Sequence, residues 1–209
     1  MTSREHILAK LRAARQPFTD VQSPAERRPV VAQLPDEDLL TSFVQQAEAL
    51  ACRVSVCDDV GSAIEHIMSV IEAHKVIAAW DFAHIPLPGL PEALDIANIT
   101  VGTPHNSQVQ IGLTGVDVAL AATGSVVLLS GPGKGREVSL LPYTHIAVLG
   151  RSRIVRDLET WLSSQRQDTA QFRQVSKYNI ISGPSRTADI AMQLVMGAHG
   201  PAEVYIVIV

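Results

Sequence analysis

The 209-residue chain has only two cysteines, too few for a disulfide framework or for a cysteine-based metal site. Cys52 and Cys57 lie in the apolar run CRVSVC. If this run is a β-strand, their separation points the two side chains to opposite faces, so they cannot form a local disulfide. We therefore expect two buried free thiols in a reducing compartment.

Positive charge and long apolar runs are also scarce. The net charge of −4 argues against nucleic acid as a partner, because neutralising phosphates requires a basic surface. No apolar run approaches the roughly 20 residues of a membrane-spanning helix, and no signal-peptide pattern precedes the first expected helix. We therefore expect a soluble, cytoplasmic protein with no transmembrane segment.

The first 35 residues are more basic than the rest of the chain. Residues 2–15 have the apolar spacing of an amphipathic helix, and residues 16–35 contain four prolines and no periodicity, which indicates a linker. The sequence thus predicts a basic helical arm with its linker over 1–35 and an α/β domain over 36–209. Such an arm docks on an acidic partner or a membrane surface or, more often, packs on its own domain or on a sister subunit. Packing on a sister subunit would make the protein a homo-oligomer.

From residue 36 onward, expected helices alternate with short apolar strands. We expect helices at 36–50 (capped by Asp36), 59–74, 152–166 and 187–196. We expect strands at 52–57, 75–80, near Ile99, and at 145–149, 178–182 and 203–209. This rhythm predicts βαβ units with a parallel sheet covered on both faces. Residues 118–130 instead predict a hairpin around a Thr-Gly turn. The fold class is therefore α/β, a three-layer α/β/α arrangement with a mostly parallel sheet, plus a β-hairpin and an N-terminal helical arm.

The stretch ISGPSR, residues 181–186, ends an expected strand and opens an expected helix. Open α/β sheets bind ligands at the carboxyl ends of their strands, where helix N-termini offer unpaired N–H groups to an anion. Arg186 adds a guanidinium suited to carboxylate or phosphate. The corner therefore predicts an anion site. An ion pair between Arg186 and Asp189 on the same helix explains the arginine equally well.

Two more loops supply candidate residues. Residues 121–136 combine a tight turn bearing two hydroxyls with a glycine-rich loop bearing two cations, but they match neither common nucleotide-binding pattern, and a hairpin turn without a ligand is the alternative. The loop 197–201 ends the last expected helix and carries His199, which helix termination does not explain. No spacing indicates a nucleophile with its base or a metal cluster.

Three blocks, GLTGVDVALAATGSVVLLS, GREVSLLPYTHIAVL and ISGPSRTADIAMQLVMGAHGP, resemble in this order the LUD-domain family of lactate-utilisation protein C. The resemblance covers about residues 36–209. It implies a three-layer α/β/α fold similar to sugar-phosphate isomerases and coenzyme A transferases. It also implies a role in oxidising L-lactate to pyruvate beside two partner proteins that carry iron–sulfur clusters, with no cofactor bound by this chain.

The family's recurring residues map onto Thr114, Asp117, Thr123, Gly124, Ser130, Arg136, His145, Gly183, Ser185, Arg186, Asp189, His199 and Gly200. Ala122 and Ala191 stand where the family has acidic residues, which leaves fewer groups for acid–base chemistry. The catalytic candidates are Asp117, Asp189 and His199. The ligand-binding candidates are Thr123, Gly124, Ser125, Ser130, Arg136, Gly183, Pro184, Ser185, Arg186 and Gly200.

Three functions fit these residues. We favour an accessory or ligand-binding subunit in the oxidation of L-lactate to pyruvate, which holds a small carboxylate or a phosphorylated ligand. The alternative is a free-standing enzyme of the sugar-phosphate isomerase or coenzyme A transferase type, which needs a carboxylate beside its substrate. The third is a structural adaptor. Whether the chain is an enzyme is left open.

Overall fold

The structure, a computed structural model, describes residues 3–14, 38–71, 73–165, 175–187 and 195–209. The chain divides into two compact units, Met1–Val30 and Val31–Val209. In the first unit the described residues form helix α1 (Ser3–Ala14), as their apolar spacing predicts, and its Ile7 and Leu11 are exposed. All remaining elements belong to the second unit.

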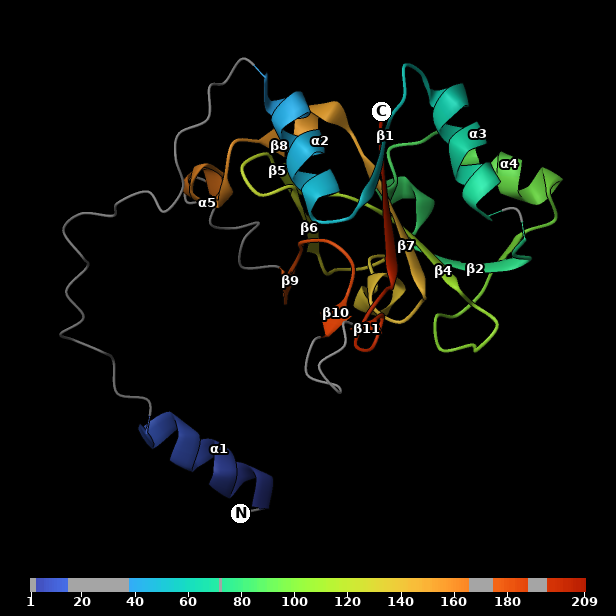
Figure 1. Ribbon diagram of the computed structural model, residues 1–209. Coiled ribbons are helices and arrows are strands. Elements are labelled where there is room, and N and C mark those ends of the chain that lie inside the picture. The colour runs from blue at the N-terminus through green and yellow to red at the C-terminus, as the bar shows by residue number, and fades with distance from the viewer. Residues whose placement is uncertain (1–2, 15–37, 72, 166–174, 188–194) are drawn as a thin grey trace. The chain divides into compact units, whose positions relative to one another are not determined.

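A sheet of six parallel strands forms the centre of the second unit, in the order β1-β12-β7-β4-β2-β3 (Figure 1). Every residue of β4 and β7 is buried, as expected for a parallel sheet covered on both faces. The predicted three-layer α/β/α fold is confirmed. The strands are β1 (Arg53–Val56), β2 (Val76–Ala79), β3 (Thr100–Val101), β4 (Ile111–Gly115), β7 (Thr144–Leu149) and β12 (Glu203–Ile208).

In the described part of this unit, the α-helices are α2 (Leu39–Ala49), α3 (Val60–Ile71), α4 (Leu90–Ile96) and α5 (Leu158–Gln165). None of the described helices is long and apolar enough to cross a membrane. The cap of α2 is Asp38, whose carboxylate accepts a hydrogen bond from the Thr41 backbone N–H at 3.2 Å, so the prediction of Asp36 as the cap was wrong. Helix α5 begins later than predicted because a 3₁₀ helix, η4 (Arg151–Arg153), and strand β8 (Ile154–Val155) precede it.

A second sheet has four strands in the order β8-β5-β6-β9. Strands β5 (Val118–Leu120) and β6 (Ser125–Leu129) form the predicted hairpin, and β9 (Tyr178–Ile181) pairs antiparallel with β6. We expected β9 in the parallel sheet. That expectation was wrong, because the backbone of β9 is hydrogen-bonded to the hairpin.

Strands β10 (Arg186–Thr187) and β11 (Val195–Met196) form an antiparallel pair. The predicted helix over 187–196 is therefore wrong at both ends, and its middle, 188–194, lies outside the described residues. The physical reason lies in the hydrogen bonds of Ser185: its N–H donates to the Pro201 carbonyl at 2.8 Å, and its carbonyl accepts from Gly197 at 2.9 Å. The described ends of this segment are thus hydrogen-bonded to each other across the β10–β11 pair and not along a helix.

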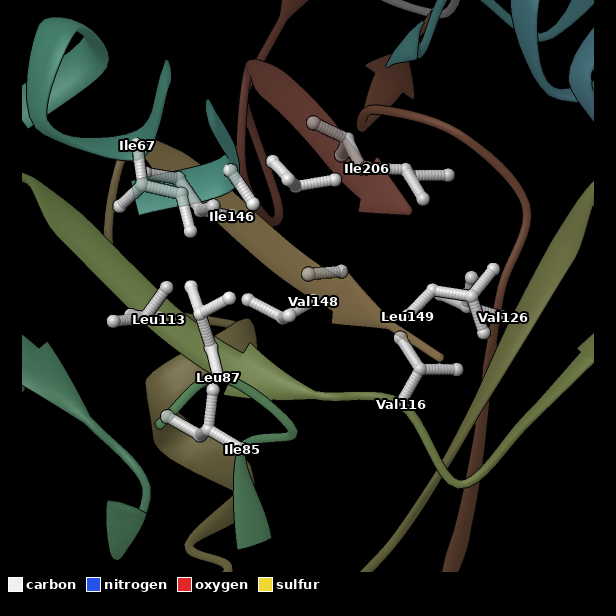
Figure 2. Close-up of a cluster of buried hydrophobic side chains, with 14 of the residues drawn as sticks. Ile67, Ile85, Leu87, Leu113, Val116, Val126, Ile146, Val148, Leu149 and Ile206 are labelled. Atoms are coloured by element: carbon white, nitrogen blue, oxygen red, sulfur yellow. The ribbon is translucent and has the colours of Figure 1, made fainter. Parts of the chain in front are cut away.

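One apolar core joins the central sheet to its covering elements. Figure 2 shows side chains of this core, among them Ile67 from α3, Leu113 from β4, Ile146 from β7 and Ile206 from β12. Val126 extends the same core into the second sheet. The two sheets therefore share one hydrophobic core, which fixes their positions relative to each other.

Candidate functional site

Three hydroxyl groups meet at the turn of the β5–β6 hairpin. The Thr123 hydroxyl donates to the Ser125 oxygen at 2.9 Å, and Ser125 Oγ lies 2.8 Å from Ser182 Oγ. Ser182 directly follows β9, so these bonds join the predicted turn to the GPSR segment. Ser125 is buried, whereas Thr123 and Ser182 are exposed.

The last turn of α2 lies against the same two loops. A Cβ atom on Gly124 would lie 2.2 Å from the Ala47 nitrogen, and one on Gly183 would lie 2.5 Å from the Leu50 carbonyl oxygen. Both glycines also have positive φ, 63° and 88°. These two glycines therefore allow the loops to pack closely against the backbone at the end of α2.

Arg186 also contacts this end of α2. Its Nη2 donates to the carbonyl oxygen of Leu50 at 2.9 Å, where the helix dipole favours a cation. No carboxylate among the described residues forms an ion pair with Arg186, and Asp189 lies outside them. Burial raises the pKa of the nearby Cys52 thiol to about 11, and the charge of Arg186 opposes that rise. We call Thr123, Ser125, Ser182, Gly183 and Arg186 the α2-end cluster.

The loop that carries His199 adjoins this cluster through Ser185. The backbone N–H of His199 donates to Ser185 Oγ at 3.3 Å, and a Cβ on Gly200 would lie 3.4 Å from the Ser185 Cβ. The His199 imidazole is exposed, and Pro184 is buried. The structure thus brings the predicted corners at 123–125, 183–186 and 199–200 to one side of the molecule.

The α2-end cluster lies at the amino-terminal edge of the central sheet. Helix α2 leads into the start of β1, and Pro201, which accepts the hydrogen bond from Ser185, precedes β12. From the sequence, we expected residues 181–186 at the carboxyl end of a parallel strand and beside a helix N-terminus. Both parts of that placement were wrong, so the anion-binding capacity of the cluster depends on Arg186 and the hydroxyls.

A second group of polar residues lies at the carboxyl edge of the sheet. Lys134 Nζ is 2.5 Å from Asp117 Oδ1 and 4.9 Å from the centroid of the Trp80 ring, and Arg153 Nη1 is 3.9 Å from the same Asp117 oxygen. The other Asp117 oxygen accepts from the Leu129 N–H at 2.8 Å. We call Asp117, Lys134, Arg153 and Trp80 the carboxyl-edge cluster.

Sequence reasoning found Asp117 but missed its three neighbours in this cluster. Trp80 directly follows β2, and Asp117 follows β4 by two residues. That position after a parallel strand is the signal that could have identified Trp80 and Arg153, which follow β2 and β7. Lys134 follows the hairpin strand β6, so this signal does not apply to it. Lys134 was noted only as a loop cation.

Other candidates make no contact with either cluster among the interactions of the described residues. Ser130 bonds to Ser176 and Lys177, and Arg136 is exposed on a 3₁₀ helix, η3 (Arg136–Ser139). His145 is fully buried in β7 with Nε2 2.9 Å from the Thr114 hydroxyl, and burial lowers its pKa to about 4. No group of three or more histidine, cysteine or acidic side chains in the described residues could hold a metal ion.

The second unit matches known proteins in sequence and in fold. Residues 40–209 match the family model of the LUD domain. The chain is 35% identical over 156 residues to lactate utilization protein C of Shouchella clausii, which covers 71% of this chain and 68% of that protein. It is 36% identical over 161 residues to the protein of the same name from Halalkalibacterium halodurans, covering 73% and 70%.

A solved structure shares the fold. The crystal structure of a DUF162 family protein from Deinococcus radiodurans superimposes with a TM-score of 0.60 at 20% identity, covering 84% of this chain and 98% of that one. The family resemblance seen in the three sequence blocks is confirmed by the family match and by these relatives. The chain belongs to the LUD domain family.

Proposed function

We propose that this protein acts in lactate utilisation as an accessory subunit that binds a small carboxylate at the α2-end cluster. Its relatives at 35% and 36% identity are named lactate utilization protein C, which supports the process. The observation that carries the binding proposal is Arg186, an exposed guanidinium with no carboxylate among the described residues to neutralise it.

The chemistry of the cluster suits a 2-hydroxy acid. A guanidinium has five N–H donors in a planar fork, and Arg186 uses one of them on the Leu50 carbonyl. The remaining donors can bind a carboxylate, and the exposed hydroxyls of Thr123 and Ser182 can bind the hydroxyl of the ligand. A phosphorylated ligand would use the same donors.

Partner subunits are part of this proposal. Oxidising lactate to pyruvate releases two electrons, and iron–sulfur clusters that accept electrons are held by cysteine thiolates. The two cysteines of this chain are free and buried, so the chain is poorly suited to hold an iron–sulfur cluster. We therefore propose that cytoplasmic partner subunits supply the clusters and that this chain, alone or as a homo-oligomer, presents the ligand.

The enzyme alternative has weaker support from the geometry. A carboxylate that acts as a general base must be free to take a proton from the substrate. Both oxygens of Asp117 are engaged, one by Lys134 and one by the Leu129 N–H. Asp189, the other acidic candidate, lies outside the described residues. The accessory function therefore accounts for more of what the site contains.

Deletion of the gene in its host tests the proposal. Growth on L-lactate as the sole carbon source should slow, while growth on glucose should be unchanged. Complementation with wild type or with Lys75→Gln, an exposed cation at the start of β2, should restore growth on L-lactate, whereas Arg186→Gln should not. If Arg186→Gln restores growth as well as wild type, the chain is an adaptor and the binding proposal is wrong.

A further inference from the structure

We infer that the carboxyl-edge cluster is a second anion site, which takes a small oxyanion, phosphate or carboxylate, independently of the α2-end cluster. The inference goes beyond the proposed function, because it concerns a different edge of the sheet and different side chains. It depends on three observations: where the cluster lies in the fold, how its charges are arranged and how firmly it is held.

The position is the one at which open parallel sheets bind ligands. Strands β7, β4 and β2 are neighbours in the sheet. Trp80 follows β2, Asp117 follows β4, and Arg153 follows β7 through the turn that begins at Gly150. Residues after the carboxyl ends of adjacent strands converge on one crevice, as in other doubly wound folds. The α2-end cluster lies at the opposite edge of the sheet, where such folds do not usually bind ligands.

Within the four residues of the cluster, the ion pairs join two cations to one carboxylate. Lys134 and Arg153 both approach Asp117 Oδ1, at 2.5 and 3.9 Å, so two cations face one carboxylate. The side chains of Lys134 and Asp117 are only 13% and 16% exposed, where charges interact more strongly than in water. The Arg153 side chain is 42% exposed and uses Nη1 on the Val116 carbonyl, so the rest of its guanidinium is open to a ligand from solvent.

The loop that carries Lys134 is fixed before any ligand arrives. The Asp81 N–H donates to the Gly133 carbonyl at 2.8 Å, and the Trp80 indole donates to the Gly135 carbonyl at 3.0 Å. The Trp80 ring also lies under the Lys134 ammonium, a cation–π contact. Binding an oxyanion therefore costs little ordering of this loop, which favours affinity.

The two sites are far enough apart to act separately. Asp117 lies just before β5, and Thr123 lies just after it, so they occupy opposite ends of the hairpin. At about 3.3 Å per residue, the strand between them separates the clusters by roughly 10 Å or more. One small ligand cannot contact both, so each site can be tested alone.

Trp80 provides the readout. The chain has two tryptophans, so a Trp161→Phe background leaves Trp80 as the only indole, under Lys134. Titration with inorganic phosphate should change the Trp80 emission and saturate. Lys134→Met should weaken phosphate binding by about tenfold or more, the usual loss when a charged hydrogen bond is removed. Arg151→Gln, an exposed arginine on the same 3₁₀ helix as Arg153, should bind as wild type does.

Asp117→Asn separates ligand binding from a merely structural ion pair. It removes the competing carboxylate and keeps both cations, so phosphate should bind several-fold more tightly. Asp117→Asn/Lys134→Met removes both members of the buried pair and leaves only the Arg153 cation, whose side chain is 42% exposed. It should fold but bind phosphate as weakly as Lys134→Met. If L-lactate displaces bound phosphate in an Arg186→Gln background, the ligand is a carboxylate. If L-lactate does not displace it, the ligand is a phosphate. No saturable response in wild type and Asp117→Asn, or equal affinity in Lys134→Met, would overturn the inference.

Discussion

Arg186 and Leu50, 136 residues apart in the sequence, are joined by a 2.9 Å hydrogen bond from the guanidinium to the carbonyl at the end of α2. This bond fixes the β10–β11 hairpin against the helical turn that also packs on Gly124 and Gly183. One helix end therefore assembles three distant segments into a cluster. Arg186 is exposed and uses one donor in this bond, which leaves its other donors for a ligand.

Gly124→Ala should destabilise the protein strongly. The added methyl group would lie 2.2 Å from the Ala47 nitrogen, and alanine is strained at φ 63°. Overpacking and strain together should lower the free energy of unfolding by about 3 kcal/mol. Gly131→Ala is the matched control, since a Cβ there meets nothing within 4 Å. Urea denaturation of both variants checks this, and equal midpoints would show that α2 does not fix the turn.

The stability of the protein should fall as pH drops from about 6.5 to about 4, in part because of His145. Burial lowers the folded-state pKa of His145 to about 4, so the unfolded state takes up the proton first. Above pH 6.5 the imidazole is neutral in both states and has no effect. Between pH 6.5 and pH 4, His145 should lower the free energy of unfolding by about 3 kcal/mol, because each unit of pKa difference corresponds to about 1.36 kcal/mol.

A double variant isolates the His145 contribution from that of the carboxyl groups. Thr114→Val/His145→Leu removes the imidazole and its hydroxyl partner together, so no buried polar group is left unpaired. Its unfolding free energy should depend less on pH than that of wild type between pH 6.5 and 4. Parallel curves for the two proteins would contradict burial as the cause.

Asp38→Ala should weaken the start of α2. The Asp38 carboxylate accepts the Thr41 N–H at 3.2 Å, and loss of an N-cap costs about 1 kcal/mol. Gln45→Ala, at an exposed position in the same helix, should change stability by less than about 0.5 kcal/mol. Thermal denaturation distinguishes them, and a stable Asp38→Ala protein would mean that the cap is supplied elsewhere.

The sequence was sufficient to predict most of the central sheet but not β4. Its residues IGLTG contain two glycines, which count against a strand in any local pattern. In the structure Gly112 and Gly115 are required because a Cβ would lie 1.8 Å from the Val138 carbonyl oxygen and 2.1 Å from that of His84. These contacts come from residues far along the chain, so no local pattern reveals them.

The sequence marked both segments of the α2-end cluster by their glycines and hydroxyls, but it indicated the wrong place for them in the fold. The turn at Thr123–Ser125 contacts Ser182, the residue before the GPSR segment, through hydroxyl groups. These two segments lie at the amino edge of the central sheet because β9 pairs with β6 in the second sheet. The sequence of β9 alone does not determine which of the two sheets it joins. The carboxyl-edge cluster was missed for the same reason, since it depends on which strands are neighbours.

Calorimetric titration of the purified protein with L-lactate tests the central claim most directly. Wild type and Lys75→Gln should bind L-lactate with equal affinity, whereas Arg186→Gln should bind at least about tenfold more weakly, because a charge-assisted hydrogen bond contributes about 1.5–3 kcal/mol. Asp117→Asn should bind no more weakly than wild type. Absence of L-lactate binding in wild type, or unchanged affinity in Arg186→Gln, would contradict the account.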